Sequence, residues 1–159
     1  MKPERKHPRL KEYDYSLPGY YHVTICVADD SVSLSRIVPG EIHLTKAGAI
    51  ARKQLLALEQ RYSYVRIDKY VIMPNHIHVI IRLLDEKVQK KRPDVTSIVG
   101  TFKSLTTRLC NDIYDTPGKK WFQTSFYDEI LRNEKAYQEC WRYIDENPLK
   151  WLLKPEELR

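Results

Sequence analysis

The stretch that decides the predicted fold is Lys69-Tyr-Val-Ile-Met-Pro-Asn-His-Ile-His-Val-Ile-Ile-Arg82. Its two apolar parts, 70–73 and 77–81, are rich in β-branched residues and flank Pro74-Asn75. β-Branched residues favour strands, and a Pro-Asn pair between two apolar runs favours a turn. The sequence therefore predicts two short, buried strands joined by a tight turn.

The second of these strands carries two histidines, His76 and His78. Successive side chains of a strand point to opposite faces, so the two imidazoles share one face, about 7 Å apart. Ile77 and Val79 point to the other face. Two imidazoles directed together are suited to bind one divalent cation. The same spacing also fits two hydrogen-bonded histidines on a half-exposed sheet, so the pair alone leaves both interpretations open.

Composition bounds the class of protein. With 159 residues and 42% hydrophobic content, the chain is expected to fold as one domain, residues 1–159, without disulfides. The net charge of +6 favours a polyanionic partner such as nucleic acid. The three cysteines form no Cys-x-x-Cys motif and are expected to be reduced. Because we find no signal-peptide pattern or membrane-length apolar run, the expected location is cytoplasmic, associated with the nucleoid.

Apolar periodicity predicts the remaining elements. In chain order these are a strand over 20–27, a loop or small hairpin over 29–44, a helix from Thr45 to Tyr62, the two histidine-hairpin strands, a helix from Asp94 or Thr96 to about Ile113, a strand over 125–131 and a closing helix over 134–146. Asn133 is expected to cap the closing helix, and Asn147-Pro148 to end it. The order βαββαβ predicts an α+β, ferredoxin-like (RRM-like) antiparallel sheet with two helices on one face.

The closing helix carries Tyr143 and Asn147 one turn apart, on the same side. Tyr143 lies about 60° around the helix from Cys140, at the border of the apolar stripe. If this side faces the histidines, Asn147 can add an oxygen ligand and Tyr143 can present its phenol to whatever the cation holds. Imidazole and amide ligands with open positions suit Mg²⁺ or Mn²⁺ better than a closed zinc site.

A tyrosine beside a cation suggests phosphoryl transfer. A phenol has an ordinary pKa near 10 and is a weak nucleophile until a cation polarises the phosphate that it attacks. Attack on DNA would give a 5′-phosphotyrosine and a free 3′-hydroxyl, which can later reseal or transfer the strand. Tyr137 is about 240° away from Tyr143 on the same helix, so the two cannot act as a pair. Tyr127 is a further, weaker candidate for the nucleophile.

Basic residues are candidates for contacts with phosphates, which would make binding dependent on salt. The N-terminal arm, about residues 1–12, has an excess of cations, and a polar connection and the second helix carry others. An ordinary solvated surface is the alternative interpretation. The candidate DNA contacts are Arg5, Lys6, Arg9, Lys91, Arg92, Lys103 and Arg108.

Several motifs together resemble one known family over nearly the whole chain. They are Met73-Pro-Asn-His-Ile-His-Val79, residues 9–16 with 21–26, the helix start at 98–104, and residues 127–134 followed by 143–151. In combination they are similar to the single-tyrosine HUH transposases and, among these, to the REP-associated tyrosine transposases.

This resemblance implies an enzyme. It implies that His76 and His78 bind a divalent metal, Mg²⁺ or Mn²⁺, with Asn147 as third ligand, and that Tyr143 is the catalytic nucleophile. It implies a single-stranded DNA endonuclease and strand transferase acting near palindromic hairpins, in DNA transposition or a domesticated derivative, and suggests a homodimer. Two alternatives are a catalytically idle regulator that binds hairpin nucleic acid and a metal-dependent small-molecule hydrolase. The positive charge and the lack of a third metal ligand of histidine or carboxylate type disfavour the hydrolase.

Overall fold

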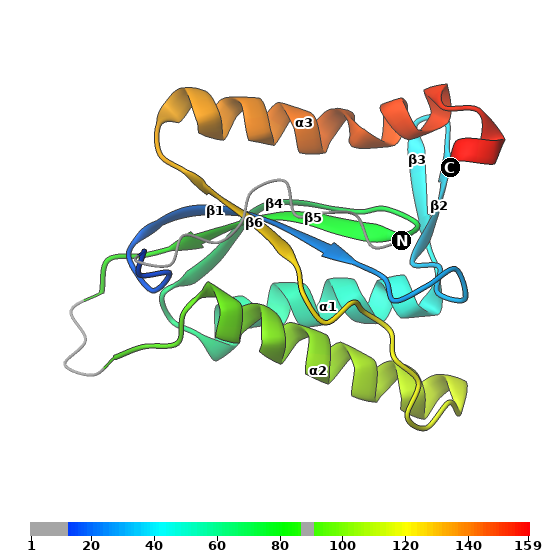
Figure 1. The fold of residues 1–159 in the computed structure, drawn as a ribbon, viewed down its shortest axis with the longest axis horizontal. Helices are drawn as coiled ribbons and strands as arrows, with labels where there is room; N and C mark the ends of the chain where they lie inside the picture. Colours follow the sequence, from blue (N-terminus) through cyan, green and yellow to red (C-terminus); the bar gives the residue numbers. More distant parts are fainter. Residues whose placement is uncertain (1–12, 87–90) are drawn as a thin grey trace.

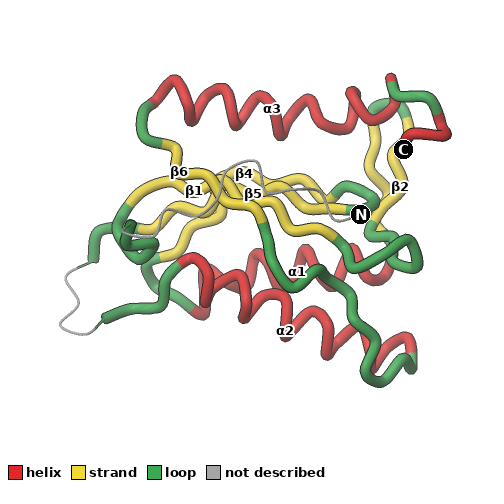
Figure 2. The backbone as a smooth tube through the Cα atoms, in the orientation of Figure 1, coloured by secondary structure: helices red, strands yellow, loops and turns green. Residues whose placement is uncertain are grey.

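The computed structural model describes residues 13–86 and 91–159, which form three layers (Figure 1). A four-stranded antiparallel sheet lies between helices α1 and α2 on one face and helix α3 on the other, as the backbone view also shows (Figure 2). The sheet strands are β1 (Gly19–Cys26), β4 (Val65–Ile72), β5 (His76–Leu83) and β6 (Tyr127–Leu131). The helices are α1 (Lys46–Arg61), α2 (Val95–Tyr114) and α3 (Glu134–Leu153), followed by a short 3-10 turn, η1 (Glu156–Leu158).

The predicted ferredoxin-like arrangement is confirmed. The strand order β4-β5-β1-β6 has the two central strands antiparallel, and α1 and α2 are the two crossover helices on one face. The loop or small hairpin expected between the first strand and first helix is a hairpin, β2 (Ser35–Val38) with β3 (Glu41–Leu44). It stands at one end of the layers and reaches α3 (Figure 1). In the described part of the chain, no helix is both long enough and apolar enough to cross a membrane.

The two faces of the sheet have separate hydrophobic cores. Ile77 and Val79 are fully buried in the larger core, which packs against α1 and α2. The smaller core lies under α3 and contains Ile80 of β5 together with Cys140 and Ile144 of the helix. Alternation along β5 therefore turns the histidines of the same strand toward α3.

The closing helix does not end at Asn147-Pro148, so that expectation was wrong. Helix α3 runs through Pro148 to Leu153. A proline inside a helix removes one backbone hydrogen bond and usually disfavours helical geometry in the residue before it. Here Trp151 and Leu152 pack against the smaller core, so tertiary burial outweighs the local preference. Trp141, also expected on the buried stripe, is 40% exposed.

Helix α1 begins where the hairpin approaches it closely. The Thr45 hydroxyl accepts a hydrogen bond from the Gly48 backbone N–H and donates one to the Ser33 carbonyl, which confirms the predicted N-cap. A Cβ atom at Gly48 would overlap the backbone carbonyl of Leu34. Glycine is therefore needed at this position for space.

We expect Gly48→Ala to lower the free energy of unfolding by roughly 1–3 kcal/mol, because the added methyl group overpacks the contact with the Leu34 backbone. Gly100 of α2 is the matched control, since a Cβ there meets no atom within 4 Å. Gly100→Ala should raise stability by about 0.5–1 kcal/mol through the lower backbone entropy of the unfolded chain. Urea denaturation measures both, and equal stability of the two variants would contradict this account of the helix start.

Candidate active site

The two histidines of β5 lie under α3. The ring centroids of His76 and His78 are 4.7 Å apart. His78 is 5% exposed, whereas His76 is partly exposed. The pair occupies the start of the strand, where β1 runs alongside with Thr24 opposite His78 and Cys26 opposite His76.

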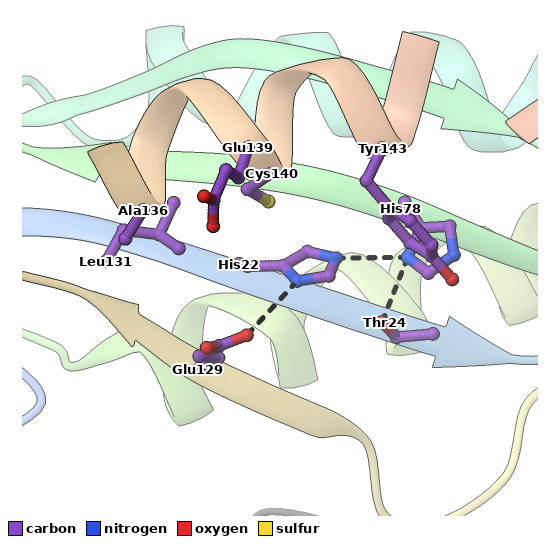
Figure 3. A pocket seen from close by; sticks show the side chains of 9 residues that line it. All are labelled: His22, Thr24, His78, Glu129, Leu131, Ala136, Glu139, Cys140 and Tyr143. Carbon is purple, nitrogen blue, oxygen red and sulfur yellow. Dashed lines mark hydrogen bonds and ion pairs between the residues drawn. The ribbon is translucent and has the colours of Figure 1, made fainter. Parts of the chain in front are cut away.

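Tyr143 reaches this pair from α3. Its ring centroid is 5.2 Å from that of His78 and 6.2 Å from that of His22, and the residue is 42% exposed (Figure 3). Cys140 and Ile144, both buried, hold the helix to the sheet beside it. The phenol is therefore fixed at the rim of the smaller core, next to the imidazoles and open to a ligand.

Hydrogen bonds orient the His76 ring. Its Nδ1 lies 2.6 Å from Oδ1 of Asn75, and because an amide oxygen only accepts, Nδ1 carries the proton. Nε2 then keeps its lone pair. The Asn147 side chain also hydrogen-bonds to this ring, which places the predicted oxygen ligand beside the predicted nitrogen ligand.

His78 also uses its Nδ1 for contacts within the protein. This atom lies 3.0 Å from the Thr24 hydroxyl and 3.1 Å from Nε2 of His22 (Figure 3). Among residues 13–86 and 91–159, no side chain or backbone group hydrogen-bonds to its Nε2, which can therefore take another partner. A metal-binding imidazole commonly bonds a protein group through one nitrogen and the metal through the other, so both rings fit this arrangement.

Burial keeps these imidazoles neutral. Loss of solvent lowers the pKa of His76 to about 4, with an opposing effect from its hydrogen bond to Asn147. Burial, followed by the effects of His76 and His22, lowers the pKa of His78 to about 2. Burial also lowers the pKa of His22. Neutral imidazoles are the form that binds a metal ion, because each retains one lone pair.

His22 was not singled out from the sequence. It lies on β1, and its side chain is 14% exposed, between His78 and Glu129 of β6. Its Nδ1 is 4.0 Å from a carboxylate oxygen of Glu129. Alternation puts His22 and Thr24 on the same face of their strand, but only the pairing of β1 with β5 brings that face to the histidine pair.

A cavity of about 390 Å³ extends from the histidines along the gap between α3 and strands β1 and β6 (Figure 3). Tyr143 and His78 form one side of it. Its walls combine imidazoles, carboxylates and small apolar groups: His22, Thr24, His78, Glu129, Leu131, Ala136, Glu139, Cys140 and Tyr143. The phenol therefore faces a space that a ligand can enter.

The last turns of α3 bring cations to the other side of Tyr143. Nζ of Lys150 is 5.3 Å from the Tyr143 ring centroid and 3.8 Å from a carboxylate oxygen of Glu146. The charge of Lys154 lowers the pKa of His76. Neither lysine was predicted as a site residue, because the helix was expected to end before both.

The predicted DNA contacts that the structure describes lie away from the histidines. Arg5, Lys6 and Arg9 are outside the described residues. Lys91 is exposed near Asp14. Arg92 lies beyond the far end of β5, where it donates hydrogen bonds to the Ser16 and Leu84 carbonyls. On α2, across the sheet from the histidines, Lys103 donates to the Gln123 and Thr124 carbonyls, and Arg108 is exposed.

Within residues 13–86 and 91–159, no three or more His, Cys, Asp or Glu side chains gather closely enough to hold a metal ion by themselves. The His76 and His78 pair would therefore need further ligands from an amide, water or a substrate. Asn147 is the side chain placed to supply the first of these.

Comparisons with known proteins place this chain in a family. No family model matches the chain. It is 30% identical over 166 residues to an uncharacterized protein of Haemophilus influenzae (strain ATCC 51907 / DSM 11121 / KW20 / Rd). The match covers 92% of this chain and 89% of that protein. The chain belongs to the same family as this H. influenzae protein.

Two solved structures share the fold. One is a REP-associated tyrosine transposase bound to a REP hairpin, with a TM-score of 0.66 and 22% identity over 90% of this chain and 74% of that chain. The other is a proposed transposase of Deinococcus radiodurans R1, with a TM-score of 0.53 and 13% identity over 88% of this chain and 97% of that chain. The resemblance drawn from the sequence motifs is thus confirmed at the level of the fold.

Proposed function

We propose that this chain is a single-tyrosine HUH transposase of the REP-associated type, a metal-dependent endonuclease and strand transferase that acts on single-stranded DNA near hairpins. One observation carries the proposal: the Tyr143 ring centroid is held 5.2 Å from that of the buried His78, which shares a strand face with the partly exposed His76. A nucleophile beside a pair of neutral nitrogen ligands fits phosphodiester chemistry better than binding alone.

The donor atoms can hold a divalent cation with open coordination positions. His76 and His78 each engage the protein through Nδ1, so that Nε2 carries the lone pair, and the Asn147 amide lies at the His76 ring. Mg²⁺ or Mn²⁺ bound there would polarise the scissile phosphate and neutralise its charge. Because these three residues leave coordination positions open, phosphate oxygens of the substrate can complete the shell.

Tyr143 performs the covalent step in this proposal. Its hydroxyl oxygen attacks the phosphorus, the bond from phosphorus to the 3′-oxygen breaks, and the phenol proton passes to solvent while the released 3′-oxygen takes up a proton. The products are a 5′-phosphotyrosine and a 3′-hydroxyl. Attack by a 3′-hydroxyl on the phosphotyrosine reverses these bond changes and joins or transfers the strand.

Lys150 is the cation best placed to hold the substrate. The imidazoles are neutral, so positive charge beside the nucleophile must come from the bound metal and from nearby side chains. Lys150 lies over the Tyr143 ring, where its ammonium can reach a phosphate oxygen next to the reacting bond. Its exposed pairing with Glu146 is weak and can be exchanged for a phosphate.

The DNA partner is inferred from charge and likeness together. The net charge of +6 favours a polyanion, and the solved transposase with the same fold is bound to a REP hairpin. A hairpin oligonucleotide with single-stranded flanks is therefore the appropriate probe. We expect its binding to weaken as salt increases, because phosphate contacts release counterions.

With Mn²⁺ and an end-labelled hairpin oligonucleotide carrying host-genome palindromes, the wild-type protein should form an adduct that survives denaturation in detergent. Tyr143→Phe should abolish the adduct, because it removes only the nucleophilic oxygen. The matched control is Tyr137→Phe on the same helix, whose hydroxyl donates a hydrogen bond to Asp68. It should lose about 1 kcal/mol of stability and retain the adduct.

Adduct formation by Tyr143→Phe would assign the chemistry to another residue. Tight hairpin binding without an adduct in wild-type protein, across the palindromes of the host genome, would favour the alternative of a catalytically idle regulator. Gel electrophoresis of the labelled DNA separates these outcomes.

Lys150→Gln should slow adduct formation in single-turnover assays by about 10- to 100-fold, which corresponds to loss of a charge-assisted hydrogen bond to phosphate. Lys150→Arg should retain most of the rate, because the positive charge is kept. Lys135→Gln is the control: Lys135 lies in the first turn of α3, and its side chain is 86% exposed. Equal rates for Lys150→Gln and Lys135→Gln would show that Lys150 does not contact the reacting phosphate.

A further inference from the structure

His22 is a mostly buried polar side chain to which the proposed reaction gives no part. Its ring centroid lies 5.2 Å from that of His78, and its two nitrogens face different partners. Nε2 is 3.1 Å from Nδ1 of His78, and Nδ1 is 4.0 Å from the Glu129 carboxylate (Figure 3). Three neighbouring strands, β6, β1 and β5, thus supply a row of groups that ends at a proposed metal ligand.

The proton positions in this row depend on one another. A neutral imidazole carries one proton, so its two nitrogens are one donor and one acceptor. If Nε2 of His78 is to bind a cation, the His78 proton must lie on Nδ1, which then donates to Thr24 or to Nε2 of His22. In that state Nε2 of His22 is an acceptor, and the His22 proton lies on Nδ1, facing Glu129.

The opposite arrangement would block the metal site. If His22 carried its proton on Nε2, it would donate to Nδ1 of His78, and the His78 proton would move to Nε2, where the cation must bind. A carboxylate accepts and cannot donate, so Glu129 favours the proton on Nδ1 of His22. At 4.0 Å this contact is electrostatic and longer than a hydrogen bond.

We propose that Glu129 and His22 are positioning residues that select the tautomer of His78 with a free Nε2 and so prepare it to bind the divalent cation. The inference rests on the proposed function, in which His78 is a metal ligand. Partners of this kind fix the tautomer and orientation of a metal-binding histidine. Thr24 holds the same nitrogen from the other side and restricts rotation of the ring.

Glu129→Gln tests the tautomer directly, because a glutamine amide can donate to Nδ1 of His22 and permit the blocking arrangement. Two-bond proton–nitrogen NMR of the metal-free, nitrogen-15-labelled protein identifies which ring nitrogen carries the proton, with His78 signals assigned by their loss in His78→Gln. The wild type should show the proton of His78 on Nδ1, and Glu129→Gln should show a population with the proton on Nε2.

Metal affinity is the second readout. Titration with Mn²⁺ alone, followed by calorimetry, should show affinity lowered roughly 10-fold in Glu129→Gln and 10- to 100-fold in His22→Phe. The control is Glu134→Gln, which changes an exposed carboxylate in the first turn of α3, outside the cavity. It should leave both the tautomer and the affinity unchanged.

The outcomes separate this inference from the proposed function. If the wild-type protein binds Mn²⁺ and Glu129→Gln keeps both the wild-type tautomer and the wild-type Mn²⁺ affinity, the positioning role is overturned. The proposed enzymatic function is then unaffected. A wild-type protein that carries the His78 proton on Nε2 would also overturn the positioning role. If His78 has the expected tautomer but the protein does not bind Mn²⁺, His22 still orients the His78 ring. That result would count against the proposed metal-dependent enzyme. If His22→Phe does not fold, Glu129→Gln still decides.

Discussion

Packing of α3 against the second face of the sheet is the constraint on which the site depends. Ile144 is fully buried, and Cys140 is nearly so, and these residues bracket Tyr143 along the helix. A salt bridge of 2.8 Å between Lys69 and Asp145 fixes the same turns to β4. These contacts fix the orientation of the helix about its own axis and its position on the sheet. The Tyr143 phenol therefore stays at the rim of the core beside the histidines.

The same burial determines the electrostatics of the site. The layer that anchors α3 also removes water from the histidines, which lowers their pKa values and keeps the imidazoles neutral. Positive charge is supplied from the edge, where Lys150 lies in the last turn of the helix and Lys154 caps its C-terminus. Neutral imidazoles inside and cations at the rim suit the proposed site, which would bind a metal and a phosphodiester together.

Local patterns predicted much of this arrangement. Alternation placed His76 and His78 on one face, and helical spacing placed Tyr143 and Asn147 on one side, because both periods are set by backbone geometry. His22 could not be found this way, since its position at the site depends on strand order between distant segments. The helix end was wrong because packing of Trp151 and Leu152 outweighed the local effect of Pro148. The hydrogen bonds of Arg92, a predicted phosphate contact, could not be foreseen, because its guanidinium donates to backbone carbonyls that only the folded chain brings to it.

The central claim is that one cation is held by the Nε2 atoms of His76 and His78 within reach of the Tyr143 hydroxyl. Anomalous diffraction at the manganese edge from crystals grown with Mn²⁺ and an uncleaved hairpin oligonucleotide locates that cation directly. The account predicts an anomalous peak at coordination distance from both Nε2 atoms, with a phosphate oxygen between the ion and the Tyr143 hydroxyl. A peak at the Nδ1 side of His78, or a fully bound hairpin with no peak at the histidine pair, would contradict it.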